Sequence, residues 1–227
     1  MNLRPRQLSF PLGAPPVYTR AAFVESSANT DALTALERWP AWPNGVLALV
    51  GPEGSGKTHL ATIWATRAGA GRFAPGDDLA ALAGRPVLVE DADNVVNGAG
   101  DEALFHLINR AAADGGLLLT ARTRPTAWAS ALPDLRSRLN ALTVVELGEP
   151  DDALMVAVLE ALFREKLRRP LPELYEYLLK RMPRSVAAAR EVVRLLDEAA
   201  GAEAPPRPLN RALAREVLDE TADLFGD

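Results

Sequence analysis

The chain has 227 residues, a net charge of −5 and 48% hydrophobic residues, which is enough apolar content to bury the core of one domain, or of a large domain plus a small one. The acidic balance gives no overall attraction to phosphate backbones, so nucleic-acid binding would need a local basic patch. Zero cysteines exclude disulfides, a zinc ribbon and thiolate catalysis. No apolar stretch of about 18 residues occurs, which predicts a soluble cytoplasmic protein that does not associate with membranes.

The first segment, residues 1–16, contains four prolines and few periodic apolar positions. It is therefore predicted to be an extended tail that is free to bind a partner. Residues 17–148 have a different pattern, in which short apolar runs are typical of strands covered on both faces. The predicted strands are 45–50, 86–89, 117–120 and 143–147.

Helical patterns separate these strands. One runs from Lys57 to about Ala68, and a second has apolar residues at i, i+3, i+4 and i+7 and ends at Gly115. The alternation of strand and helix predicts an α/β fold with a doubly wound parallel sheet, whose ligand lies at the carboxyl ends of the strands. The second helix is expected to bury Leu104, Leu107, Ile108 and Ala111.

Residues 149–227 show helical periodicity with no further strand, which predicts a small all-helical lid domain. Two of its helices have clear apolar faces. The first is expected to bury Met155, Val158, Leu159 and Leu162, and the later one Val186, Ala189, Val193 and Leu196.

The strongest motif is a glycine-rich loop between the first predicted strand and the next helix, which matches the P-loop pattern in both sequence and context. Its glycines let backbone N–H groups face phosphate oxygens, its lysine adds a point charge, and its threonine offers a hydroxyl ligand to Mg²⁺. The predicted nucleotide-binding residues are Gly51, Pro52, Glu53, Gly54, Ser55, Gly56, Lys57 and Thr58, with His59 flanking them.

A second motif is the apolar strand that ends in Glu90 and Asp91, which is the arrangement expected for a Walker B strand. One acid of such a pair serves the metal and the next polarises water. We assign Glu90, with Thr58, to Mg²⁺ and Asp91 to catalysis, although the sequence leaves open which acid performs which role. Glu90 is longer by a methylene than the usual aspartate, which weakens the expectation of efficient hydrolysis.

The order of these motifs resembles the DnaA family of AAA+ proteins over nearly the whole chain, and within it the short homologues called Hda, regulatory inactivators of DnaA. The resemblance implies an AAA+ core with a lid. It also implies that the tail docks on the sliding clamp, the beta subunit of DNA polymerase III. The matching hexapeptide is Gln7, Leu8, Ser9, Phe10, Pro11 and Leu12; an alternative is that its apolar side chains anchor the tail on its own domain.

The same resemblance implies roles for three further residues. Asn29 lies in the adenine-side segment, Arg138 matches an arginine finger that acts in trans, and Arg184 matches the sensor II arginine. Two departures stand out. Ala121 and Arg122 follow the strand where DnaA proteins usually carry Ser-Asp, and we expect no DnaA-type helix-turn-helix domain after the final helix.

The leading hypothesis is a nucleotide-bound regulator of replication initiation that stimulates ATP hydrolysis by DnaA while docked on the clamp. The implied ligand is ADP or ATP with Mg²⁺, and the implied partners are DnaA, the clamp, and a homodimer or AAA+ oligomer. DNA would be contacted indirectly through the clamp. The alternatives are an independent ATPase of the helicase-loader type and a DNA-binding adaptor that uses basic residues of the lid.

Overall fold

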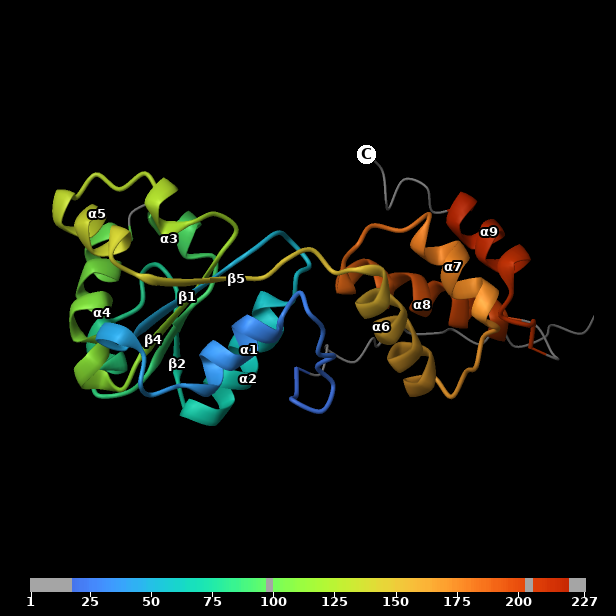
Figure 1. The fold of residues 1–227 in the computed structure, drawn as a ribbon, viewed down its shortest axis with the longest axis horizontal. Helices are drawn as coiled ribbons and strands as arrows, with labels where there is room; N and C mark the ends of the chain where they lie inside the picture. Colours follow the sequence, from blue (N-terminus) through green and yellow to red (C-terminus); the bar gives the residue numbers. More distant parts are fainter. Residues whose placement is uncertain (1–17, 97–99, 203–205, 221–227) are drawn as a thin grey trace, which may run out of the picture.

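The computed structural model describes residues 18–96, 100–202 and 206–220. The predicted clamp-binding hexapeptide, residues 7–12, lies outside these ranges. The described chain consists of a sheet with flanking helices, followed by a separate group of helices (Figure 1).

The sheet is five-stranded and parallel throughout its printed pairings, with the order β2-β3-β4-β1-β5. Its strands β1 and β4 are buried at every position, as expected for strands covered on both faces. The predicted parallel α/β sheet is thus confirmed, with one strand more than expected. The strands are β1 (Val46–Val50), β2 (Gly71–Phe73), β3 (Val87–Val89), β4 (Leu117–Ala121) and β5 (Thr143–Glu146).

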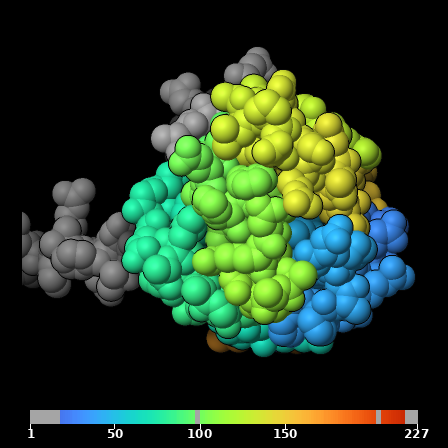
Figure 2. Space-filling view, turned by 90° about the vertical axis from the view of Figure 1, so that its left-hand side faces the viewer, coloured from blue at the N-terminus to red at the C-terminus, as the bar shows by residue number. Residues whose placement is uncertain are grey.

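Helices cover both faces of the sheet. On one face, α1 (Thr30–Glu37) and α2 (Lys57–Ala68) pack against it, and on the other face lie α3 (Ala92–Val96), α4 (Asp101–Asp114) and α5 (Pro133–Asn140). Figure 2 views the molecule from the end opposite the helical group, where α4 and the region of α5 form the surface.

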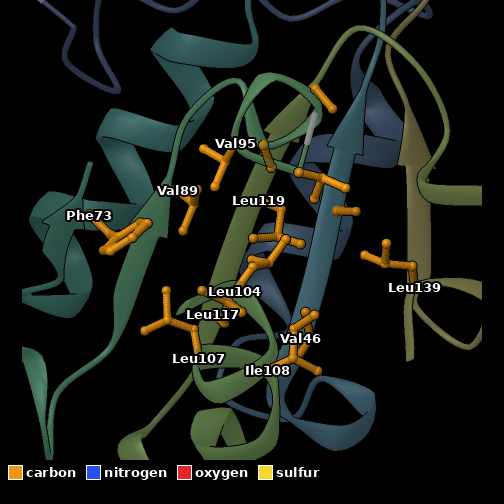
Figure 3. Packing of buried hydrophobic residues seen from close by; sticks show 14 of the residues in the cluster. Val46, Phe73, Val89, Val95, Leu104, Leu107, Ile108, Leu117, Leu119 and Leu139 are labelled. Carbon is orange, nitrogen blue, oxygen red and sulfur yellow. The ribbon is translucent and has the colours of Figure 1, made fainter. Parts of the chain in front are cut away.

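The α4 helix shows how the sequence pattern becomes packing. The predicted apolar stripe faces the sheet, and its four members are between 0% and 8% exposed. Figure 3 shows Leu104, Leu107 and Ile108 among Val46, Leu117 and Leu119 of the strands. Gly115 ends the helix with φ 92°, a left-handed conformation that glycine adopts without a steric penalty.

The helical group comprises α6 (Asp152–Glu165), α7 (Pro172–Leu179), α8 (Val186–Gly201) and α9 (Arg211–Glu220), which share one apolar cluster. The Asp151 carboxylate accepts a hydrogen bond from the Leu154 N–H and so caps α6. All four residues predicted for the first helix are buried. On α8, Val186 is only partly buried, whereas Ala189, Val193 and Leu196 are buried as predicted.

Residues 24–29 join the sheet part to the helical group. Val24 packs against the apolar cluster of the helical group, and the Gly148 N–H, just beyond β5, donates to the Ala28 carbonyl at 3.2 Å. Ser27 donates to Asp151 at 3.3 Å. The chain therefore crosses between the two parts at residues 148–151. Residues 24–29 contact this crossing segment and the helical group, and so hold the same junction.

Within the ranges that the structure describes, no helix is both long and apolar enough to cross a membrane.

Candidate functional site

The P-loop connects β1 to α2, and its glycines are required by the backbone. Gly54 and Gly56 have φ values of 76° and 97°, which side chains rarely tolerate. At Gly51 the constraint is space, because an added Cβ would lie 2.6 Å from the Leu147 carbonyl oxygen. The loop is therefore a tight backbone cradle at the carboxyl ends of the strands.

Lys57 supplies the positive charge of this cradle. It is 8% exposed, and its Nζ donates to the carbonyl oxygens of Gly51 at 2.8 Å and Pro52 at 2.7 Å. Burial lowers the pKa of Lys57, and the negative charge of Asp91 opposes that shift. Among the described residues Ser55 Oγ has no hydrogen-bond partner although it is buried. These donors fit a phosphate group.

Among the charged side chains that shift the pKa of Lys57, Asp91 has the largest effect. Its backbone has φ 49°, a left-handed conformation that is uncommon for a residue with a side chain. The Asp91 N–H donates to Thr120 Oγ1 at 3.1 Å, and Thr120 is buried on β4. The hydroxyl of Thr120 thereby holds the backbone that places Asp91.

Glu90, by contrast, is not brought to the P-loop as its assignment to the metal requires. Its carboxylate forms an ion pair with Arg72 of β2, and Arg72 also donates to Thr62 of α2 at 3.0 Å. The alternation of side chains along a strand explains this placement, because Leu88 belongs to the cluster on the α1–α2 face and Glu90 shares its side of the strand. Of these two acids, Asp91 is the one whose charge acts on Lys57.

The expected Mg²⁺ ligands are therefore only partly assembled by this chain. Thr58 is exposed in the first turn of α2, and the described residues contain no group of three or more His, Asp or Glu side chains that could hold a metal. Nucleotide-bound Mg²⁺ uses one or two protein oxygens together with phosphate oxygens and water. Thr58 and Asp91 fit that smaller requirement.

Aromatic side chains border the start of α2. His59 lies against Tyr18 and Phe23, with ring centroids 5.2 and 5.1 Å away, and its Nε2 donates to the Thr19 carbonyl at 2.8 Å. Burial lowers the pKa of His59, and this effect outweighs the hydrogen bond to Thr19. Burial thus favours the neutral form of the imidazole beside the P-loop.

Asn29 is buried, but both ends of its amide serve the 24–29 turn. Oδ1 accepts from the Ser26 N–H at 3.0 Å and Nδ2 donates to the Val24 carbonyl at 3.0 Å. Asn29 thus shapes its own turn, where its side-chain amide is already satisfied, and its place on the adenine side stays a prediction.

The helical group touches the P-loop through the start of α8. A Cβ on Gly54 would lie 2.2 Å from Ser185 Cβ, and Ser185 Oγ caps α8 by accepting from the Ala188 N–H at 3.1 Å. The positive end of the α8 dipole therefore adjoins the cradle. The adjacent Arg184, the predicted sensor II residue, forms an ion pair with Asp152 at 2.7 Å.

Arg138 lies away from this chain's own cradle, in the last turn of α5. Its side chain is exposed, and within the part of the chain that the structure describes no hydrogen bond or ion pair engages its guanidinium. Arg136, on the same helix, is also exposed.

Sequence reasoning missed one contact at the mouth of the cradle. Arg122, which follows β4, forms an ion pair with Glu53 of the P-loop at 3.1 Å. Its backbone N–H donates to Asp93 at 3.1 Å. The sequence did single out Arg122 as unusual, but no motif connected it with Glu53, because the two residues meet only when β4 lies beside β1.

A parallel sheet in this order, with a P-loop after its buried strand β1 and a helical group after its last strand, defines the AAA+ P-loop fold. No protein-family model matches the chain.

Comparisons with known proteins agree on that fold. Domain III of the replication initiation protein DnaA from Thermotoga maritima superposes with a TM-score of 0.73 at 17% identity, covering 94% of this chain and 99% of that one. AMPPCP-bound DnaA from Aquifex aeolicus gives a TM-score of 0.69 at 18% identity, covering 89% and 69%. The RuvB Holliday junction branch migration motor of Thermotoga maritima gives 0.68 at 18% identity, covering 90% and 72%.

A relative at the sequence level is an uncharacterized protein from Haemophilus influenzae, 31% identical over 116 residues. The match covers 50% of this chain and 50% of that protein, so it spans about half the length of this relative. At these identities the likeness to DnaA and RuvB describes the architecture that all of them share.

Proposed function

We propose that this chain is a nucleotide-binding AAA+ regulator of chromosome replication initiation of the Hda type. Docked on the DNA polymerase III sliding clamp through Gln7–Leu12, it stimulates ATP hydrolysis by DnaA and so inactivates it. It works in the cytoplasm and meets DNA through the clamp. Its own nucleotide, with ADP favoured over ATP, orders the core against the helical group.

The observation that carries this proposal is the state of Arg138. A guanidinium that is exposed and unpaired within the described chain can reach an anion on another molecule without first breaking an ion pair. Inserted beside a partner's terminal phosphate, it stabilises charge that develops during hydrolysis. The fold likeness to DnaA supports DnaA as the partner by analogy of architecture.

A held nucleotide is supported by the cradle itself. Lys57, the loop N–H groups and the start of α8 converge where phosphates fit, and Thr58 with Asp91 would hold Mg²⁺. Bound Mg²⁺ neutralises phosphate charge and orients the phosphate oxygens. The ion pair between Glu90 and Arg72 takes the first Walker B acid away from this task, which supports a nucleotide that is retained rather than turned over.

The deciding experiment measures ATP hydrolysis by DnaA in the presence of clamp-loaded DNA, with and without this protein. The wild type is expected to raise the turnover of ATP by DnaA, and Arg138→Ala is expected to lose this stimulation. Arginine fingers of other systems raise kcat about 10³–10⁵-fold, so the loss should be large. Arg136→Ala is the matched control on the same helix. Equal stimulation by Arg138→Ala and Arg136→Ala would refute the assignment.

A separate measurement addresses the tail. The double substitution Gln7→Ala and Leu8→Ala is expected to abolish binding to the purified clamp while leaving nucleotide affinity unchanged. Clamp binding that survives this change would remove the tail from the proposal without affecting the role of Arg138.

One observation favours a second function, an independent ATPase of the helicase-loader type. Asp91 is exposed and acts electrostatically on Lys57, so it could also orient water in this chain's own site. Steady ATP turnover by the purified protein alone, lost in Asp91→Asn, would support that function over the regulator.

A further inference from the structure

The mouth of the P-loop holds an arrangement of charge beyond the Lys57 cradle. Arg122 reaches Glu53 from the end of β4 at 3.1 Å, and the two side chains are 58% and 77% exposed. Both residues affect the pKa of Lys57, because the charge of Arg122 lowers it and the charge of Glu53 raises it. Glu53 is thus paired with Arg122, and the two side chains act on Lys57 with opposite charges.

The Arg122–Glu53 ion pair is easily exchanged. A pair this exposed contributes little to stability, because water screens it and both side chains lose freedom in forming it. An arginine–phosphate contact is stronger, since the planar guanidinium can donate two parallel hydrogen bonds to a group that carries more charge than a carboxylate. A phosphate in the cradle would therefore outcompete Glu53 for Arg122.

The backbone of Arg122 is placed for that exchange. Its N–H is fixed by Asp93 at 3.1 Å, and the preceding Ala121 carbonyl accepts from the Gly51 N–H at 3.2 Å. The root of the side chain is thus tied to the first residue of the P-loop, and only the guanidinium needs to turn.

We propose that Arg122 is a phosphate-binding residue of this chain, which releases Glu53 and binds the terminal phosphate of the nucleotide held in the P-loop. It acts in cis, on the nucleotide of its own chain, whereas Arg138 acts on a partner. A second function follows for Glu53, which occupies Arg122 until a nucleotide arrives. This inference rests on the nucleotide binding proposed above.

The proposed contact of Arg122 with phosphate also determines how strongly nucleotide affinity depends on Mg²⁺. Arg122 and Mg²⁺ both neutralise phosphate charge, so each becomes more important when the other is absent. The wild type is expected to keep measurable nucleotide affinity in EDTA, with Arg122 as the reason.

The test compares Arg122→Ala with Glu53→Gln, because both substitutions break the same ion pair. Fluorescent ATP and ADP analogues are titrated by anisotropy, in Mg²⁺ and in EDTA. Arg122→Ala is expected to weaken binding about tenfold to a hundredfold, with the larger loss in EDTA. Glu53→Gln is expected to bind more tightly than the wild type, because Arg122 then has no carboxylate to release before it contacts the phosphate. Melting curves without nucleotide check that both variants fold.

If the two variants weaken binding equally, the ion pair is structural and the proposal is wrong. If Arg122→Ala binds like the wild type in both buffers, it is also wrong. Lys57→Ala separates this inference from the proposed function. Full nucleotide affinity in Lys57→Ala would mean that the P-loop is not the nucleotide site, whereas loss of affinity there with unchanged Arg122→Ala would refute only the role of Arg122.

Discussion

Replacing Thr120 by valine tests how Asp91 is held in its left-handed conformation. Valine has nearly the same shape but lacks the hydroxyl that accepts the Asp91 N–H at 3.1 Å. Thr120 is 1% exposed, so water cannot readily replace the lost acceptor. Leaving a backbone donor unpaired costs about 1–3 kcal/mol, and because this N–H is only partly buried we expect the lower part of that range, about 1–2 kcal/mol.

The assay has two readouts. Urea unfolding should show that loss of 1–2 kcal/mol, which corresponds to a melting temperature lower by about 2–8 °C for a chain of this size. Amide exchange should show faster exchange at Asp91 in Thr120→Val, and wild-type protection in Thr120→Ser, which keeps the hydroxyl. Wild-type stability together with a protected Asp91 amide in Thr120→Val would refute this account of the strand end.

Three further changes concern the surroundings of the site. Ser185→Ala removes the cap of α8 and should cost about 1 kcal/mol in urea unfolding; an unchanged midpoint would mean that the cap contributes nothing. Burial lowers the pKa of His59 below its usual 6.5, so the unfolded chain binds the proton more readily. Stability should therefore be complete above about pH 6.5 and fall below it, and His59→Gln should remove that part of the slope in unfolding midpoints measured from pH 5 to 8. Phe163→Ala, at a side chain that is 0% exposed in the helical group, should cost about 3–5 kcal/mol by calorimetry, and a loss under 1 kcal/mol would contradict the packing described.

The fold was largely predictable because its signals are local. Buried parallel strands appear as continuous apolar runs, and the α4 stripe and Gly115 mark a helix and its end. The strand β2 was missed because Gly71–Phe73 is three residues long, with burial at both ends and an exposed arginine between them. It is a strand because it pairs with β3, and pairing is a long-range property.

The site was predictable only where a motif carries it. The P-loop glycines and Lys57 were found from spacing, but the side on which an acid falls depends on strand alternation and on the left-handed turn at Asp91. Neighbours from distant strands then decide the outcome, as Arg72 does for Glu90. No local pattern reports such a partner, and the contact of Ser185 with Gly54 was invisible for the same reason.

Val24 favours the arrangement in which the helical group stays packed at the junction with the sheet part. Its side chain is partly buried in the apolar cluster of the helical group, although its own segment leads into α1 of the sheet part. Swinging the helices away would expose that side chain to water at about 1 kcal/mol, roughly half the value for a fully buried valine. That energy corresponds to about a fivefold preference for the arrangement in which Val24 is packed against the helices. A ligand or partner could overcome so small a preference, and the helices would return to this arrangement when it leaves.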